Sequence, residues 1–129
     1  MKIFIIDNEV ARQRNLRAIL QSLGYKSGEV ESSDDPALGI SELKKRQYGA
    51  LFVYLEMPKM NALDLARTVR SSSRLKQLPI VVYSADVSKD NVMSAVEAGA
   101  NGFLGYPFSV SDVESALRHA TKNAAANHK

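Results

Sequence analysis

The chain has 129 residues, a formal net charge of +3 and no cysteine. This length suits one domain with a single core, and the lack of cysteine excludes disulfides and cysteine-based zinc or iron–sulfur sites. The two histidines, His119 and His128, have no metal-ligand spacing, and the basic residues are dispersed, so no direct nucleic-acid partner is expected. No apolar run reaches the length of a membrane span and the chain starts with a strand rather than a charged leader, which predicts a cytoplasmic protein without membrane association.

Strands and helices are predicted to alternate along the first half of the chain. Residues 2–6 form a buried strand, and Asp7 is the first polar residue after it. A helix follows and ends at Gly24, with an apolar stripe at Val10, Leu16, Ile19, Leu20 and Leu23. Residues 28–31 are a weak strand that only their position suggests. A second helix begins at Pro36 after Asp34 or Asp35 and buries Ala37, Ile40, Leu43 and Leu38.

The second half continues the alternation. Residues 50–55 are an apolar, β-forming run that Pro58 ends, and Asn61 caps a third helix. A strand at residues 79–83 precedes Ser84, and Ser88 caps a helix over residues 89–98 with an inner face of Val92, Ala95 and Val96. A fifth strand spans residues 102–105, and Ser109 or Ser111 caps the last helix. Residues 122–129 are expected to be a flexible tail.

Five strands that alternate with single helices predict an α/β domain with a doubly wound parallel sheet, helices covering both faces. In such a sheet the carboxyl ends of the strands form the binding crevice. The residues that the predicted strands place there are Asp7, Asn8, Tyr54, Glu56, Ser84 and Tyr106.

Five landmarks in order resemble the receiver domain of bacterial response regulators, the CheY-like family. They are Ile5-Ile6-Asp7-Asn8-Glu9, Met57-Pro58-Lys59-Met60, Val82-Tyr83-Ser84-Ala85, the run from Ala98 to Phe103, and Pro107-Phe108. The resemblance implies a flavodoxin-like sheet of order 2-1-3-4-5 in a receiver-like domain over residues 1–121. It also implies a role in a two-component or phosphorelay signalling system. An enzyme in the ordinary sense is not expected, because the strand-end residues offer no nucleophile, base and orienting group beyond the weak pair of Asp7 and Ser84.

The chain departs from the receiver pattern at the positions that carry the chemistry. Receivers hold Mg²⁺ with an acidic pair after the first strand, accept phosphate on an aspartate three residues before Met-Pro, and place a lysine before the last Pro-Phe. This chain has Asn8, Tyr54 and Tyr106 there, so only Asp7 and Ser84 match. A neutral phenol is a poor substitute for a carboxylate nucleophile, and Glu56 lies two residues too far along to replace it. We therefore expect a degenerate phosphorylation pocket with no cofactor and weak or absent Mg²⁺ binding, Asp7 being the one weak metal candidate.

Three hypotheses concern the aromatic residues. Tyr54 and Tyr106 are expected to plug the vestigial pocket. By resemblance, Ser84 and the ring of Phe103 would form any switch that persists, biased by a partner instead of by phosphate. The Tyr106–Pro107 peptide bond is expected to be cis, as in receivers.

The leading prediction for function is a phosphorylation-independent protein–protein interaction module. By resemblance, its partner surface lies on the fourth helix, fifth strand and fifth helix and includes Lys89, Val92, Glu97, Phe103 and Asp112. Partners would be a histidine kinase, another regulator, or a chemotaxis or motility component. One alternative is an active phosphorelay receiver with a substitute acceptor such as Asp7, Glu56 or Ser84. Another is a module that binds a small planar ligand in the tyrosine-lined crevice, although the chain has no glycine-rich phosphate loop after Asp7.

Overall fold

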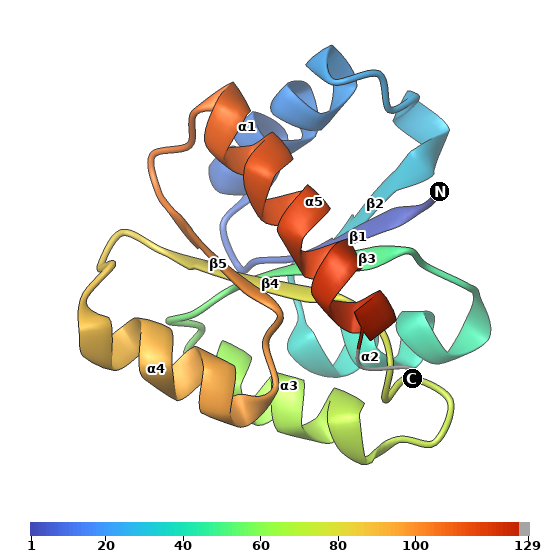
Figure 1. The fold of residues 1–129 in the computed structure, drawn as a ribbon. Coiled ribbons are helices and arrows are strands. Elements are labelled where there is room, and N and C mark those ends of the chain that lie inside the picture. The colour runs from blue at the N-terminus through green and yellow to red at the C-terminus, as the bar shows by residue number, and fades with distance from the viewer. Residues whose placement is uncertain (127–129) are drawn as a thin grey trace.

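The fold is an alternation of strands and helices, seen in a computed structural model that describes residues 1–126 (Figure 1). His128 and the end of the predicted tail, residues 127–129, lie outside the described residues. The elements are β1 (Ile3–Ile6), α1 (Val10–Ser22), β2 (Val30–Ser33), α2 (Pro36–Lys45), β3 (Ala50–Tyr54), α3 (Ala62–Ser71), β4 (Ile80–Ser84), α4 (Lys89–Ala98), β5 (Gly102–Gly105) and α5 (Val110–Ala126).

The sheet is parallel throughout and has the order β2-β1-β3-β4-β5, which confirms the predicted fold. Helices α1 and α5 cover one face, and α2, α3 and α4 cover the other (Figure 1). Successive residues of β1 alternate between the two cores: Phe4 and Ile6 pack with the second helix layer, and Ile3 and Ile5 with the first. All strands therefore end at the same edge, where the candidate site lies.

The weak strand is real but begins later than predicted. A 3₁₀ turn occupies Ser27–Glu29, and β2 follows with Val30 paired to Ile3. Because β2 is an edge strand, only Val30 among its residues is fully buried, so the apolar signal in its sequence is weak.

The predicted helix caps form where the sequence placed them. The side chains of four cap residues each accept a hydrogen bond from a backbone N–H in the first helical turn: Asp35, Asn61, Ser88 and Ser109. Two helix ends use glycine with a positive φ, Gly24 at 107° and Gly99 at 110°, a conformation that residues with a Cβ rarely adopt. These local signals therefore located most of the helix boundaries.

Several apolar positions assigned to buried stripes face solvent instead. Val10, Leu38 and Val96 are 50%, 64% and 59% exposed, and Ala37 is also exposed. On α2 the buried side is Pro36, Gly39, Ile40 and Leu43. The helix is rotated in this way because it approaches the sheet at Gly39, where a Cβ would lie 2.6 Å from Ile6 Cδ1.

The last helix is longer than predicted. α5 continues through residues 122–126, which were assigned to a tail, in keeping with the high helix propensity of alanine. Asn123 Nδ2 donates to the carbonyl of Asn101 at 3.3 Å, which holds this last part of the helix to the loop before β5. Among residues 1–126, no helix combines the length and apolar character that a bilayer crossing requires.

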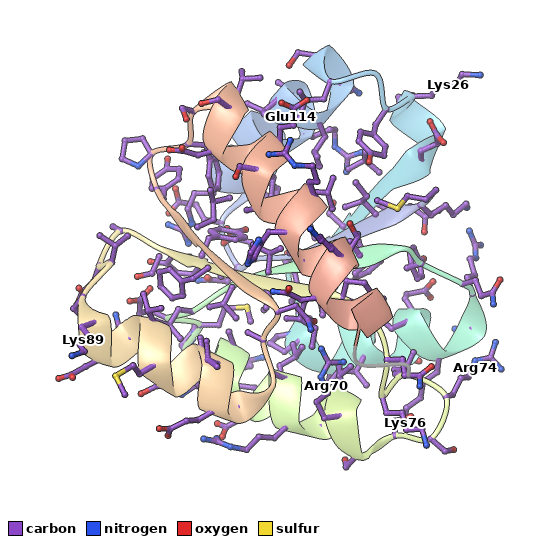
Figure 2. The ribbon with its side chains drawn as sticks, viewed as in Figure 1. Lys26, Arg70, Arg74, Lys76, Lys89 and Glu114 are labelled. Atoms are coloured by element: carbon purple, nitrogen blue, oxygen red, sulfur yellow. The ribbon has the colours of Figure 1, made fainter. Side chains whose placement is uncertain are left out.

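Arg70, labelled in Figure 2, joins three segments near the amino ends of β4 and β5, at the edge of the sheet opposite the strand carboxyl ends. Its guanidinium donates to the carbonyls of Gly99 at 2.9 Å and Leu78 at 2.7 Å, and to Asn101 Oδ1 at 2.6 Å. Burial lowers the pKa of Arg70. Arg70 therefore stabilises the fold by joining α3 to the loops that precede β4 and β5.

Candidate functional site

The carboxyl ends of the strands bring together most of the predicted site residues. Asp7 follows β1, Tyr54 ends β3 with Glu56 just beyond it, and Ser84 ends β4. The register pairs Tyr54 with Tyr83 on the next strand. Hydrogen bonds then link the strand ends in two groups, one around Asp7 and one around Ser84.

Asp7 is fully buried, and its carboxylate is hydrogen-bonded on every side. It accepts from the backbone N–H of Glu9 at 2.9 Å and from the Tyr83 hydroxyl at 2.6 Å. The Arg12 guanidinium adds two more bonds of 2.9 Å, from Nε to Oδ2 and from Nη2 to Oδ1. A buried charge is tolerated only when it is paired and hydrogen-bonded, so these donors account for the ionised carboxylate.

Arg12 is the functional residue that sequence reasoning missed most clearly. Its Cζ lies 3.6 Å from the centre of the Tyr54 ring, and Nη1 forms an ion pair of 3.0 Å with Glu9. Burial opposes the charge, but the hydrogen bonds and charge of Asp7 outweigh it and raise the pKa of Arg12. The signal in the sequence was an arginine in the first turn of α1, close enough to reach back to the end of β1.

Tyr54 is half-buried and packs against both hydrophobic cores. Its ring lies 5.7 Å from that of Tyr83. Burial raises the pKa of Tyr54, the Arg12 charge opposes that effect, and the nearby carboxylate of Glu56 adds to it. The phenol is therefore neutral at physiological pH and remains a weak nucleophile.

Ser84 and Glu56 form the second group. The fully buried Ser84 hydroxyl donates to Glu56 Oε2 at 2.7 Å and accepts from the Asp86 N–H at 3.0 Å. Glu56, which was predicted to lie at the crevice but too far along the loop to replace the acceptor aspartate, points back to the end of β4. The single O–H donor of Ser84 is therefore engaged by Glu56 and is not free for another acceptor.

Tyr106 is connected to the site by contacts between aromatic rings. Its centroid is 5.0 Å from Phe108, which is 5.1 Å from Tyr83 in a second edge-to-face contact. Tyr106 is itself half-buried, so an aromatic chain runs from Tyr54 through Tyr83 and Phe108 to Tyr106. The predicted cis Tyr106–Pro107 bond is confirmed.

Ser84 and Phe103 are not paired in the sheet. Phe103 is opposite Val82, and Ser84 is opposite Gly105. Phe103 is half-buried and packs against the core shared by α2, α3 and α4. A switch that couples these two side chains stays a prediction.

The residues at this site do not fit the Mg²⁺ ion that the resemblance implied. Magnesium prefers carboxylate and water oxygens in an octahedron, but both Asp7 oxygens are bound to Arg12, while residues 8 and 54 offer an amide and a phenol. Within the described part of the chain, no three histidine, aspartate or glutamate side chains are grouped so as to hold a metal.

A small cavity of about 120 Å³ lies beside the site. Its lining is Asn8, Asp34, Asp35, Pro36, Met57, Pro58 and Lys59. Neither Tyr54 nor Tyr106 lines it, so this cavity is not the tyrosine-lined crevice that the ligand-binding alternative required.

The predicted partner surface is largely exposed. Lys89, Glu97 and Asp112 face solvent, while Val92 and Phe103 are half-buried, and Lys89 lies at the start of α4 in Figure 2. A groove of about 270 Å³ runs between β5 and α5, with a lining of Gly102, Phe103, Leu104, Gly105, Asp112, Ser115, Ala116 and His119. The sequence analysis did not predict two exposed apolar side chains of α4, Met93, which is 48% exposed, and Val96, which is 59% exposed.

The sequence profile of the response regulator receiver domain matches residues 3–118. The chain belongs to this family. The chemotaxis protein CheY of Pseudomonas aeruginosa is 32% identical over 109 residues, which are 84% of this chain and 86% of that protein. The chemotaxis protein CheY-3 of Vibrio cholerae is 28% identical over 117 residues, 91% of this chain and 88% of that protein.

Solved structures share the fold of this receiver. A putative response regulator of Chloroflexus aurantiacus superposes with a TM-score of 0.86 at 23% identity, covering 94% of this chain and 97% of that one. CheY4 of Vibrio cholerae gives 0.82 at 24% identity, covering 92% and 97%. The receiver domain of a sensor histidine kinase from Pseudomonas aeruginosa, with a magnesium ion in its active-site cleft, gives 0.81 at 21% identity, covering 94% and 97%. These structures show the shared fold, and the match of the family profile over residues 3–118 makes the chain a receiver domain of two-component signalling.

Proposed function

We propose that this receiver does not use aspartyl phosphorylation and acts as a phosphorylation-independent protein-interaction module. The observation that carries the proposal is Tyr54, which stands where the family pattern expects the phosphate acceptor. Its half-buried ring lies under the Arg12 guanidinium, and its phenol has a raised pKa. A neutral phenol in this setting does not form the acyl phosphate on which receiver activation depends.

The groups that would stabilise a transferred phosphoryl group are also replaced or engaged. The position of the receiver lysine is Tyr106, which has no positive charge to place on a phosphoryl oxygen. The Ser84 hydroxyl donates to Glu56 instead of to an incoming oxygen. The cation that is present, Arg12, is held by Asp7 and Glu9. We accordingly propose that Mg²⁺ binding is weak or absent.

The substitute acceptors would each have to give up existing bonds. Asp7 is fully buried beneath Arg12 and Tyr83, and Ser84 is fully buried with its hydroxyl donating a hydrogen bond to Glu56. Glu56 is exposed, and its carboxylate is the more accessible of the three candidates. A search for residual phosphorylation should therefore examine Glu56 first.

The partner surface in this proposal is the exposed face of α4, β5 and α5. Met93 and Val96 are three residues apart on α4 and so lie side by side on its surface. Val87, which is 59% exposed, is close to Gly105 of the edge strand β5, because a Cβ on that glycine would lie 3.1 Å from Val87 Cγ1. Exposed apolar side chains of this kind are typical of protein contacts. The partner classes remain a histidine kinase, another regulator, or a chemotaxis or motility component.

Phosphorylation is tested on the wild-type protein with acetyl phosphate and Mg²⁺, followed by intact mass and by amide spectra with beryllofluoride. A phosphorylatable receiver treated in parallel serves as the positive control. We expect an unchanged mass and unchanged amide signals around Asp7 and Ser84. An added phosphoryl mass that peptide mapping places on Asp7, Glu56, Ser84 or Tyr54 would refute the proposal.

The interaction surface is tested with the M93D/V96D variant. The control is L38D, which adds a charge at an exposed leucine on α2, in the other part of the helix layer. Cross-linking in host extracts should yield a two-component or motility protein with the wild type and L38D, equally with and without acetyl phosphate. The same capture by M93D/V96D, at an unchanged melting temperature, would exclude this face, and capture that requires acetyl phosphate would exclude phosphorylation independence.

A further inference from the structure

We propose that Arg12 is a tethered cation that takes the place of a divalent ion at the acidic site of this receiver and closes the site to Mg²⁺. The inference rests on the proposed function and deepens one part of it, because it names the group that prevents Mg²⁺ binding at the strand ends; it is independent of any partner surface.

The guanidinium is surrounded by oxygen atoms in the way an ion would be. Its planar fork meets the Asp7 carboxylate with two bonds of 2.9 Å, the bidentate geometry in which arginine binds carboxylates most strongly. Nη1 lies 3.0 Å from Glu9 Oε2, and Nη2 lies 3.4 Å from Asn8 Oδ1. Side-chain oxygens of three consecutive site residues therefore face one fixed positive charge.

The same guanidinium contacts both positions at which the family pattern has lost a carboxylate. One is Asn8, through the Nη2 contact, and the other is Tyr54, whose ring face lies 3.6 Å from Arg12 Cζ. Aromatic faces attract cations through the ring quadrupole. The substitutions at residues 8 and 54 thus make partners that suit a guanidinium better than a hard divalent ion, which requires charged oxygen ligands.

Burial makes this arrangement hard to displace. The Arg12 side chain is 11% exposed and the Asp7 side chain is 0% exposed. A divalent ion that reached Asp7 would have to detach the guanidinium from it, and the two positive charges would then share a poorly solvated site. Restoring carboxylates at residues 8 and 54 should therefore not be enough to open the site to Mg²⁺, because the Arg12 guanidinium would still occupy Asp7.

The experiment restores the carboxylates and varies the cation. N8D/Y54D is compared with N8D/Y54D/R12M and with a matched control, N8D/Y54D/R14M. Arg14 is an exposed arginine on the same helix, so R14M removes the same charge without touching the site. Mg²⁺ affinity is measured by calorimetry, and Mn²⁺ broadening of amide signals near residues 7 and 84 locates the ion.

We expect R12M to strengthen Mg²⁺ binding at least about tenfold over N8D/Y54D, with R14M close to no change. Equal affinity with and without Arg12 would overturn the inference. An equal gain from R14M would also overturn it, because the effect would then be one of overall charge.

A measurement on the wild type keeps the inference testable if the triple variant does not fold. The Arg12 Nε–H signal in a ¹⁵N spectrum should be protected from exchange and unmoved by millimolar Mg²⁺. Loss of that protection on adding Mg²⁺ would show that the ion displaces the guanidinium and would refute the inference. Either result leaves the phosphorylation and partner tests of the wild type to be judged separately.

Discussion

The pairing of Arg12 with Asp7 should dominate the stability of the site, and a double-mutant cycle measures it. Arg12→Met leaves the fully buried Asp7 carboxylate without its cation, while the Tyr83 hydroxyl and the Glu9 N–H still donate to it. Asp7→Asn removes the charge and keeps the shape. The double variant lacks both charges, so it has no uncompensated ion in the core.

The expected magnitudes follow from these contacts. Removing one partner of a buried ion pair costs about 3–5 kcal/mol, and we expect about 3 kcal/mol for Arg12→Met because Asp7 keeps two donors. Asp7→Asn loses charge-assisted hydrogen bonds and should cost about 2 kcal/mol. The double variant should cost about 3 kcal/mol rather than their sum of about 5 kcal/mol, which is a coupling energy of about 2 kcal/mol.

Urea unfolding followed by far-ultraviolet circular dichroism gives the free energy of unfolding of each protein. Domains of this kind have about 5–15 kcal/mol of stability, so all four proteins should stay folded without denaturant. The control is Arg14→Met, which should be additive with Asp7→Asn. If the Arg12 and Asp7 effects also add within about 0.5 kcal/mol, the two side chains do not form the coupled pair described above.

Three further predictions concern Tyr83, Glu31 and Gly39. Tyr83→Phe removes the hydroxyl bound to Asp7 and should cost about 2 kcal/mol in urea unfolding at neutral pH. Burial, and after it the charge of Asp7, raise the pKa of Tyr83 in the folded protein, so the unfolded chain loses the phenolic proton more easily. The free energy of unfolding of the wild type should therefore fall above about pH 10 more steeply than that of Tyr83→Phe. Parallel pH slopes of the two proteins would contradict this. Hydrogen bonds from a tyrosine hydroxyl and from a lysine lower the pKa of Glu31 in the folded protein. The contribution of Glu31 to stability is therefore present above about pH 4.3 and is lost as the pH falls further, so Glu31→Gln should flatten the acid branch of the plot of unfolding free energy against pH. An acid branch identical to that of the wild type would rule this contribution out. Gly39→Ala should lower the free energy of unfolding by about 1–2 kcal/mol, because a Cβ there would lie 2.6 Å from the buried Ile6 Cδ1. A higher free energy of unfolding in the variant would mean that the helix propensity of alanine prevails.

Local signals in the sequence were sufficient for the order of elements. Continuous apolar runs marked the buried strands, and polar caps such as Asn61 and Ser88 marked helix starts, because both depend on neighbouring residues alone. The rotation of a helix on the sheet does not. Leu38 and Val96 were assigned to the core, but close packing at Gly39 and Ala95 turned them toward solvent.

The sequence by itself determined the receiver fold and the set of residues at the strand ends, since a parallel sheet brings those ends to one edge whatever the side chains are. The resemblance to receivers also predicts that residues 8, 54 and 106 depart from the family pattern, which stays a prediction. Only the tertiary structure decided which side chains surround Asp7. The Tyr83 hydroxyl binds Asp7 across 76 positions of the chain, and Arg12 reaches back from α1 to the same carboxylate. Such contacts depend on side-chain direction and burial, which the spacing of residues along the chain does not specify.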